Sequence, residues 1–440
     1  MKRYPAYKDS GIDWIGEIPE HWEVKKLKYF SKIVNGSTPK SGKGEYWGGK
    51  IVWLTPNDLG KLNGNLITDS LKKITQPGLD SCGATLTPKN SIILSTRAPI
   101  GHIVITDIMT CTNQGCKTIV HDSSKCDNKF LFYYLFSSKN TLQSLGQGST
   151  FIELSSQNLK DFQNAFPPLP EQQTIANYLD RKTHLIDTLI EKKQRLIDLL
   201  KEQRTAIINQ AVTKGLNPDV KLKDSGIEWL GDIPEHWDVK KGKYLFSIVN
   251  GYPPEQINFA EDGQHTYFRV DDLNEDGHGL YLTNGKAKFI LGSTVLYQKN
   301  LILFPKRGVA ILTNKVKITA IQNLFDTNLM GLNVFRNKAD TEFLSYCLLT
   351  RRLDDIADTS TIPQINNKHI YPLFFPLPPL IEQKSISTFL NQYIQKTDSL
   401  ILKIEKTIDY LKEYRTALIS KVVTGKIDVR DSGITEVRQL

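Results

Sequence analysis

The sequence predicts an α+β chain: two mixed α/β domains joined by two long antiparallel helices that form a coiled coil, arranged as a tandem repeat with pseudo-two-fold symmetry. Three observations predict this fold: a recurring opening motif, two long apolar stripes of helical period, and short apolar runs between turns. With 440 residues, 40% of them hydrophobic, the chain is long enough for more than one packed core.

The opening motif occurs twice. Residues 8–22 read KDSGIDWIGEIPEHW, residues 223–237 read KDSGIEWLGDIPEHW, and the similarity ends at an IVNG tetrad in both copies. A second pair of segments reads FPPLPEQQ from Phe166 and PLPPLIEQK from Pro376, and the stretches that follow end in KEQRTAII and KEYRTALI. Arg430 then begins RDSGI, a third fragment of the opening motif. A chain that ends where it began predicts termini that lie close together.

Heptad stripes predict the two helices. Apolar residues recur at alternating steps of three and four after Glu171 and after Glu382. The predicted helix-pair core is Leu179, Ile186, Leu189, Leu196, Leu200, Ile207, Leu390, Leu400, Ile404, Leu411 and Leu418. The residues expected to stop the helices are Pro170, Pro379, Gly215 and Gly425. Each helix should therefore span about 40 residues, or about 60 Å. Because a helix with one apolar stripe needs a partner, the two helices are predicted to pair with each other, and closure of the chain with a domain between them favours antiparallel pairing. Packing of each helix on its own domain is the alternative.

The domain boundaries follow from this order. A first domain is expected over residues 1–165, a central helix over 166–214, a second domain over 215–374, and a distal helix with a tail over 375–440. Short apolar runs predict strands at 51–54, 91–95, 103–106, 266–270, 301–304, 309–313 and 316–321, in twisted and mainly antiparallel sheets. Residues 130–136 fit a helix or a buried strand.

The charge balance favours a polyanionic partner. The formal net charge is +9 and the pI is about 9.0, although a soluble basic protein without such a partner has the same balance. The N-terminus has no apolar run of a signal peptide, and no segment has the roughly 18 apolar residues of a spanning helix. The five cysteines are odd in number and clustered in one half, which favours a reducing cytoplasm over a disulfide framework.

Basic and polar residues gather in the turns of both domains. Arginine and glutamine read base edges through paired hydrogen bonds, whereas lysine and serine mostly hold phosphates. Arg97 and Arg307 occupy matching places after the apolar runs that end at Leu94 and Phe304. The candidate DNA-binding residues are Lys40, Lys43, Arg97, Gln147, Thr150, His265, Arg269, Lys306, Arg307 and Gln364. Each of them taken alone also fits an ordinary solvated surface group.

Motifs of enzyme chemistry are incomplete. GSTPKSGKG from Gly36 resembles a phosphate loop but has one residue too many before its lysine and no hydroxyl residue after it. Glu23-Val24-Lys25 and its second copy resemble a nuclease fragment without a paired upstream acid, and the cysteines between 111 and 126 lack the close pairs of a structural zinc site. No catalytic, cofactor-binding or metal-ligating residues are therefore predicted.

The duplicated GEIPEHW/GDIPEHW opening, the PEQQTIANYLD and IEQKSISTFL helix starts and the RTAII/RTALI helix ends resemble the specificity subunit of type I restriction–modification systems. The block GEYWGG…IVWLTPNDL from Gly44, with TRAPIG at Thr96 and TNQG at Thr112, is similar to that family's target-recognition domain. The resemblance covers nearly the whole chain.

The resemblance implies a non-catalytic subunit that binds a split double-stranded DNA sequence, one half-site per domain. It implies two methylation subunits that use S-adenosylmethionine, and two motor-nuclease subunits that need ATP and Mg²⁺, as partners. The paired helices would set the distance between half-sites and serve as the docking surface. A stand-alone nuclease or methyltransferase with a recognition module, and a protein-interaction scaffold without a DNA role, are the alternatives.

Overall fold

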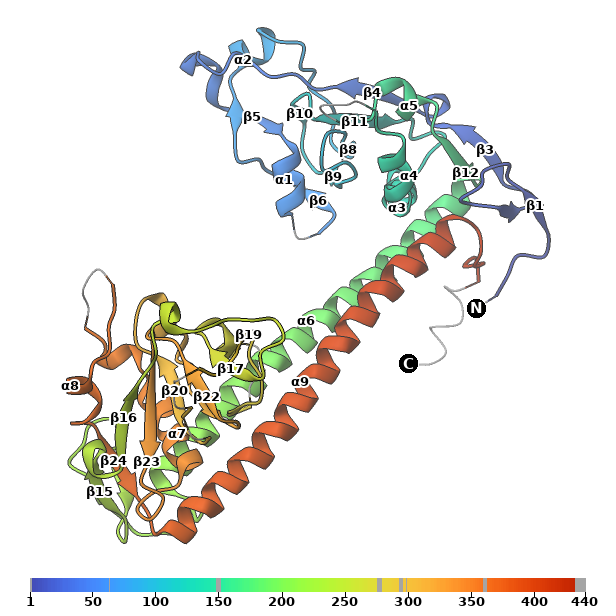
Figure 1. The fold of residues 1–440 in the computed structure, drawn as a ribbon. Coiled ribbons are helices and arrows are strands. Elements are labelled where there is room, and N and C mark those ends of the chain that lie inside the picture. Colours follow the sequence, from blue (N-terminus) through green and yellow to red (C-terminus); the bar gives the residue numbers. More distant parts are fainter. Residues whose placement is uncertain are drawn as a thin grey trace. The chain divides into compact units, whose positions relative to one another are not determined.

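The computed structural model describes residues 2–62, 64–147, 152–274, 279–292, 296–297, 299–358 and 362–431 (Figure 1). The chain divides into two compact units. Unit 1 comprises Met1–Glu191 with Thr407–Leu440, and unit 2 comprises Lys192–Lys406. Each unit thus contains one domain and one part of each long helix. In the described ranges no helix has both the length and the apolar composition needed to cross a membrane.

Unit 1 is built on a five-stranded sheet of order β4-β11-β8-β9-β6 and a three-stranded sheet of order β10-β5-β7. The strands of these sheets are β4 (Ser31–Asn35), β11 (Cys116–His121), β8 (Ile92–Ser95), β9 (Ile103–Thr106), β6 (Leu66–Ile67), β10 (Thr110–Thr112), β5 (Trp47–Leu54) and β7 (Lys73–Ile74). Two smaller sheets pair β1 (Tyr7–Asp9) with β2 (Glu17–Pro19), and β3 (Glu23–Lys26) with β12 (Gln163–Phe166). The short helices are η1 (Leu27–Tyr29), η2 (Gly44–Tyr46), α1 (Pro56–Lys61), α2 (Gln76–Asp80), α3 (Asn128–Ser137), α4 (Lys139–Ser144) and α5 (Ser156–Lys160).

Unit 2 repeats this topology. Its sheets have the orders β16-β23-β20-β21-β18 and β19-β17-β22, with the pairs β13-β14 and β15-β24. The strands are β13 (Leu222–Asp224), β14 (Asp232–Pro234), β15 (Asp238–Lys241), β16 (Phe246–Asn250), β17 (His265–Phe268), β18 (Tyr281–Leu282), β19 (Ala287–Phe289), β20 (Ile302–Pro305), β21 (Lys317–Thr319), β22 (Asn323–Phe325), β23 (Leu329–Val334) and β24 (Phe374–Leu377). The short helices are η3 (Gly242–Tyr244), η4 (Pro254–Gln256), η5 (Asp271–Asn274), η6 (Val309–Thr313), η7 (Asp354–Ile356), α7 (Thr341–Arg351) and α8 (Asn367–Ile370). The divergent contents of the two domains therefore share one fold.

The strand predictions are confirmed with one exception. The runs at 51–54, 91–95, 103–106, 266–270, 301–304 and 316–321 coincide with β5, β8, β9, β17, β20 and β21, and residues 130–136 lie in helix α3. The strand predicted at 309–313 is wrong, because these residues form the 3-10 helix η6. Gly308 (φ 77°) and Asn314 (φ 46°) bend the backbone into the left-handed region on either side.

The two long helices are α6 (Leu169–Lys214, 46 residues) and α9 (Leu380–Val423, 44 residues). Both end before a glycine with positive φ, Gly215 at 76° and Gly425 at 74°, as expected for glycines that follow a helix C-terminus. Pro170 was expected upstream of the first helix but lies in its first turn, where proline costs no intrahelical hydrogen bond.

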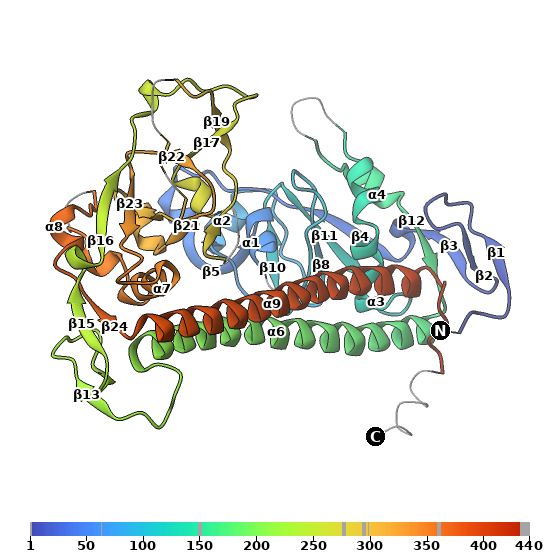
Figure 2. The same cartoon turned by 60° about the horizontal axis from the view of Figure 1, so that its bottom comes forward.

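Antiparallel pairing of the helices is confirmed within each unit (Figures 1 and 2). In unit 1, Arg415 Nε on α9 lies 2.9 Å from Asp187 on α6. In unit 2, Arg204 Nη1 on α6 lies 2.6 Å from Asp398 on α9. Arg204 belongs to the KEQRTAII segment of α6 and contacts α9, whereas Arg415 belongs to the matching KEYRTALI segment of α9 and contacts α6. The two ion pairs are therefore reciprocal.

The predicted core of the helix pair is partly wrong. Leu179, Ile186, Leu390, Ile404 and Leu418 are buried, and Leu200, Ile207 and Leu411 are half-buried. Leu189, Leu196 and Leu400 are 42%, 43% and 44% exposed. Their neighbours in sequence, Ile190, Ile197 and Ile401, are more buried. The buried stripe keeps its heptad period only because it includes polar members, Thr183 and Thr397 among them, which a search for apolar residues passes over.

The start of each long helix also packs on its own domain. In unit 1, Tyr133 on α3 donates to Asp180 on α6 (2.8 Å). In unit 2, Tyr346 on α7 donates to Asn391 on α9 (2.6 Å). The alternative arrangement that the sequence left open therefore coexists with helix pairing.

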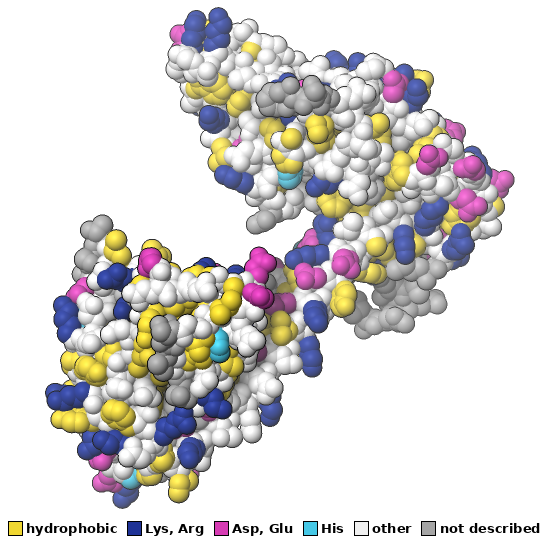
Figure 3. Space-filling view, in the orientation of Figure 1, with side chains coloured by type: hydrophobic (Ala, Val, Ile, Leu, Met, Phe, Trp, Pro, Cys, Tyr) yellow, Lys and Arg dark blue, Asp and Glu magenta, His cyan; other side chains and the backbone are white. Residues whose placement is uncertain are grey.

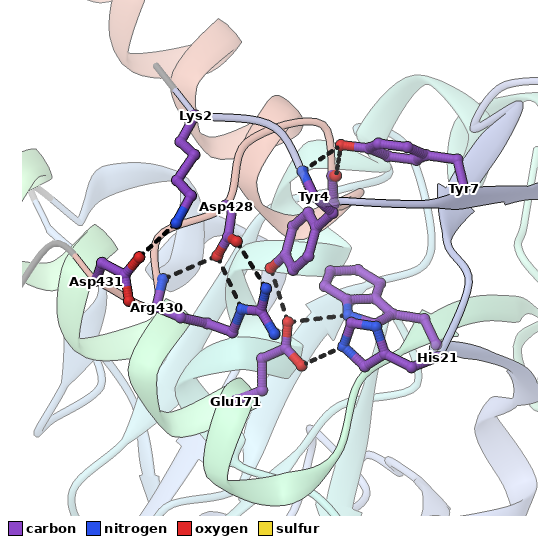
Figure 4. Close-up of polar contacts among 10 residues, drawn as sticks. Lys2, Tyr4, Tyr7, His21, Glu171, Asp428, Arg430 and Asp431 are labelled. Carbon is purple, nitrogen blue, oxygen red and sulfur yellow. Dashed lines mark hydrogen bonds and ion pairs between the residues drawn. The ribbon is translucent and has the colours of Figure 1, made fainter.

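A glutamate carboxylate joins the opening motif to each long helix, buried in unit 1 and half-buried in unit 2, and Figure 4 shows the contacts in unit 1. In unit 1, Glu171 accepts hydrogen bonds from Tyr4 (2.7 Å) and Trp22 (3.0 Å) and lies 2.7 Å from His21 Nε2. In unit 2, Glu382 repeats this arrangement with Trp237 (3.1 Å) and His236 (2.8 Å). The histidine, tryptophan and glutamate that recur in the two motifs thus form the same hydrogen-bonded node in each unit, with Glu171 at its centre in unit 1 and Glu382 in unit 2.

The neighbouring glutamine of each motif has an equally defined role. Gln172 and Gln383 donate to the carbonyls of Pro167 and Pro378, both at 2.9 Å. Their side-chain oxygens accept from the backbone N–H of Asp127 (2.9 Å) and Asp340 (2.8 Å), the N-caps of α3 and α7. The glutamate–glutamine pair therefore fixes each long helix to both the opening motif and the domain.

The predicted proximity of the termini is confirmed within unit 1. Lys2 Nζ lies 2.6 Å from Asp431, and the backbone N–H of Asp428 donates to the Lys2 carbonyl (2.9 Å). The Arg430 guanidinium lies over the Tyr4 ring, 4.8 Å from its centroid. Most of the third RDSGI fragment lies outside the described residues.

Candidate nucleic-acid interface

Charge alone does not mark a binding face. In Figure 3, Lys and Arg side chains are spread over the visible face of each unit and are interspersed with Asp and Glu. A candidate interface must therefore be found from groups of side chains that can read base edges.

Unit 1 has such a group in a polar hollow of about 460 Å³. The hollow lies where β4, β8 and β11 meet the segment that precedes α5. Its lining residues are Asn35, Gly36, Arg97, Gln114, Lys117, Gln147, Glu153, Ser155 and Ser156. None of these residues is apolar apart from the glycine, so the hollow suits a ligand with many hydrogen-bonding groups.

Arg97, Glu153 and Lys117 form an ion cluster in this hollow. Arg97 Nε donates to Glu153 Oε2 (2.8 Å), and Lys117 Nζ lies 3.2 Å from Glu153 Oε1. Partial burial raises the pKa of Glu153, but the two cations outweigh that effect, so its pKa lies below the ordinary value. The Lys117 side chain is 5% exposed and that of Arg97 is 43% exposed, so the arginine is the accessible cation.

The repeated IVNG tetrad brings a glycine to the wall of this hollow. A Cβ on Gly36 would lie 1.9 Å from the Asn113 carbonyl oxygen, and a Cβ on Gly251 would lie 2.2 Å from that of Asp326. Since neither position has room for a side chain, glycine is required in both copies.

Unit 2 has an equivalent site with different neighbours. The backbone of Arg97 forms an isolated antiparallel β-bridge with that of Glu153, and the backbone of Arg307 forms one with that of Gln364. Lys117 on β11 lies opposite Asn35 on the neighbouring strand β4, and Met330 on β23 lies opposite Asn250 on the neighbouring strand β16. The two units thus share the arginine and the asparagine, whereas the glutamate and lysine of unit 1 are replaced by Gln364 and Met330.

The structure groups some of the predicted DNA-binding residues and separates others. Arg97 and Gln147 line the hollow of unit 1, and Lys306, Arg307 and Gln364 lie together in unit 2, where Ile365 N–H donates to the Lys306 carbonyl (2.9 Å). The predicted residues outside these two groups are Lys40 and Lys43 beside η2, and His265 and Arg269 at β17. Thr150 lies outside the described residues.

Lys43 and Arg269 rest on aromatic rings. Lys43 Nζ lies 5.1 Å from the centroid of Tyr46, and the Arg269 guanidinium lies 5.1 Å from that of Phe259. Both side chains are exposed, so these residues stay candidates for contacts outside the equivalent sites.

Sequence reasoning missed Glu153, Lys117 and Gln114. Lys117 had a signal, because a lysine within the apolar strand CKTIVH needs a partner when the strand is buried. Glu153 had none, since it lies 56 residues from the arginine that it contacts.

The enzyme-like motifs have structural roles. Glu23 and Lys25 form an ion pair on β3 (2.6 Å), and Gly36 packs against the connection between β10 and β11. The described residues contain no group of three or more His, Cys, Asp and Glu side chains that could hold a metal ion.

The comparisons with known proteins agree with this architecture. The family model of the type I restriction modification DNA specificity domain matches residues 19–199 and again residues 234–410. The MjaIX type I restriction enzyme specificity subunit of Methanocaldococcus jannaschii is 29% identical over 444 residues, which cover 95% of this chain and 96% of that protein.

Two solved structures share the fold. The crystal structure of the HsdS subunit from Thermoanaerobacter tengcongensis has a TM-score of 0.58 at 17% identity, covering 93% of this chain and 98% of that one. A chain from a study of assembly and conformational transition of the type I R-M system has a TM-score of 0.73 at 16% identity, covering 93% and 99%. Because the family model matches both halves and most of the sequence, the chain belongs to the family of type I restriction–modification DNA specificity subunits.

Proposed function

We propose that this subunit reads a split double-stranded DNA sequence, with one half-site for each unit. The observation that carries the proposal is the duplicated site: one topology occurs twice, with an arginine at the same place and different neighbours around it. A shared frame with different contents fits two modules that perform one task on two different sequences.

We further propose that two methylation subunits and two motor-nuclease subunits assemble on this chain and supply the chemistry. S-adenosylmethionine, ATP and Mg²⁺ would be bound by those partners. Exposed apolar side chains on the long helices, such as Leu185, Leu402 and Tyr410, support a docking role for the helix pair. The cytoplasm is the proposed compartment, because all five cysteines are free thiols, which a reducing environment maintains.

The isolated chain is expected to catalyse nothing. A purified preparation free of partner subunits should show no DNA methylation, DNA cleavage or ATP hydrolysis, because the nucleotide and metal motifs in its sequence are incomplete. Radiolabelled methyl transfer, plasmid cleavage and phosphate release measure the three activities. Turnover by such a preparation would support the stand-alone enzyme instead.

Exchange of one domain should change one half-site. We expect that replacing residues 37–160 by the matching segment of a relative alters only one half of the methylated sequence, since these residues form a module inside the repeated frame. Sequencing of methylated genomic DNA from cells with the reconstituted complex gives the result. A change in both half-sites contradicts modularity, and unaltered sequence in both contradicts DNA reading by unit 1.

A further inference from the structure

We propose that the hollow of unit 1 reads a guanine, with Arg97 as the base-reading residue and Glu153 as the residue that positions it. The inference rests on the proposed function, because it assigns chemistry to one position within a half-site. An arginine lies at the equivalent place in unit 2 among different neighbours, which provides a comparison within the same chain.

The hydrogen bonds of Arg97 leave its reading end available. Its Nε donates to Glu153, and its two terminal amino groups have no partner among the described residues. A guanidinium held at Nε points Nη1 and Nη2 in a fixed direction, and two parallel N–H donors match the O6 and N7 acceptors of guanine in the major groove. The arginine is therefore oriented before DNA binds, which lowers the conformational entropy lost on binding.

Lys117 adds a second positive charge beside the Glu153 carboxylate. A single carboxylate between two cations leaves the cluster with one net positive charge, which suits a base edge with two acceptors. Although Lys117 lines the hollow, only 5% of its side chain is exposed, and its ammonium lies against the second carboxylate oxygen of Glu153. The remaining wall, with Gln114, Gln147 and Ser156, supplies amide and hydroxyl groups for neighbouring base edges or phosphates.

Unit 2 provides an internal comparison. Gln364 stands in the place of Glu153, and Met330 in the place of Lys117, so Arg307 lacks a carboxylate and the counter-cation beside it. No described side chain forms a hydrogen bond or ion pair with the Arg307 guanidinium. The two arginines thus present the same group with different constraints, and we expect their base preferences to differ.

The test uses the complex reconstituted with its methylation subunits. Methylome sequencing first gives the split target, and exchange of residues 37–160 assigns the half-site of unit 1. Competition binding then uses duplexes that carry this target and each single base-pair replacement. Arg97→Ala should lower discrimination at one G·C pair of the unit 1 half-site by roughly 5- to 150-fold, with the other half-site unchanged.

Glu153→Gln separates positioning from a structural role. This variant keeps the side-chain volume but replaces the ion pair with Arg97 by a weaker hydrogen bond to an uncharged amide oxygen, so discrimination at the same G·C pair should fall by roughly fivefold. The matched control is Asp161→Asn, which removes a carboxylate bound by Lys26 (3.3 Å) and Lys28 (2.8 Å) in the same unit but outside the hollow. The control should lose stability without losing discrimination.

Three results would overturn the inference. The unit 1 half-site could contain no G·C pair. Arg97→Ala could weaken all sequences equally and reduce the salt slope by about one, which is the behaviour of a phosphate contact. Glu153→Gln and Asp161→Asn could both destabilise unit 1 with discrimination intact, which is the behaviour of structural ion pairs. Failure of the domain exchange to change either half-site contradicts the proposed function itself, and is distinguishable from all three.

Discussion

Replacement of Glu171 by alanine should destabilise unit 1 by about 3–5 kcal/mol, the cost of removing one partner from a buried charged network. The Glu171 side chain is 8% exposed and accepts from the Tyr4 hydroxyl and the Trp22 indole. Burial, and then the Glu171 carboxylate, raise the pKa of Tyr4 well above its ordinary value, so the hydroxyl stays a donor. Without the carboxylate both donors remain buried with no acceptor, and the start of α6 loses its connection to the opening motif.

Glu382→Ala is the matched control for this prediction. The Glu382 carboxylate has the equivalent contacts to His236 and Trp237, but its side chain is 31% exposed and water can replace part of what is lost. We expect a smaller effect, about 1–2 kcal/mol, confined to unit 2. Hydrogen exchange measures the two units separately, at residues 169–180 and 380–391. Equal losses in both units would mean that Tyr4 and burial add nothing to the Glu171 node.

The repeated frame was the most predictable part of the fold. Several repeated residues meet a local requirement that is identical in the two copies, such as the glycine that has no space for a Cβ at Gly36 or the indole that needs an acceptor at Trp22. The shared topology of the two domain interiors was less visible, because sheet pairing depends on burial and backbone geometry that many apolar sequences satisfy.

The helix seam shows why a correct period does not fix a register. Leu189 and Leu196 continue an apolar stripe, yet Ile190 and Ile197, one position further, are more buried. The partner helix decides between the two stripes, since antiparallel packing brings Arg204 and Arg415 into the seam with their aspartates. The two ion pairs join residues that are 194 and 228 positions apart, and contacts at such separations leave no trace in the local pattern of either helix.

The candidate site was predictable in part. The matching places of Arg97 and Arg307 followed from the apolar runs before them, and the equivalent bridges of the two arginines confirm those places. Contact of either arginine with DNA stays a prediction. Their different neighbours, Glu153 and Gln364, come from the segments before α5 and α8, and only the folded sheet brings them to the arginines.

Matched lengthening of both long helices should lengthen the DNA spacer between the half-sites. Arg204 follows Asp187 on α6 by 17 positions, and Arg415 follows Asp398 on α9 by 17 positions, so the reciprocal ion pairs enclose equal stretches. One heptad inserted within each stretch keeps the 3.5-residue period and both ion pairs. Seven helical residues add about 10.5 Å, and one base pair occupies about 3.4 Å, so the spacer should grow by about three base pairs.

An insertion of Leu-Glu-Ala-Leu after Leu189 on α6 alone is the contrasting variant. Leu189 lies outside the buried seam, and lengthening one helix of an antiparallel pair by four residues moves one arginine about 6 Å from its aspartate. We therefore expect weakened helix pairing and reduced methylation from this variant.

Three added base pairs also rotate one half-site by about a third of a turn around the DNA axis, so the matched variant should methylate more slowly than the parent complex. Methylation of duplexes with spacers from two base pairs shorter to five base pairs longer gives the preferred length directly. An active matched variant that keeps the parental spacer would show that the helices do not set the distance between half-sites.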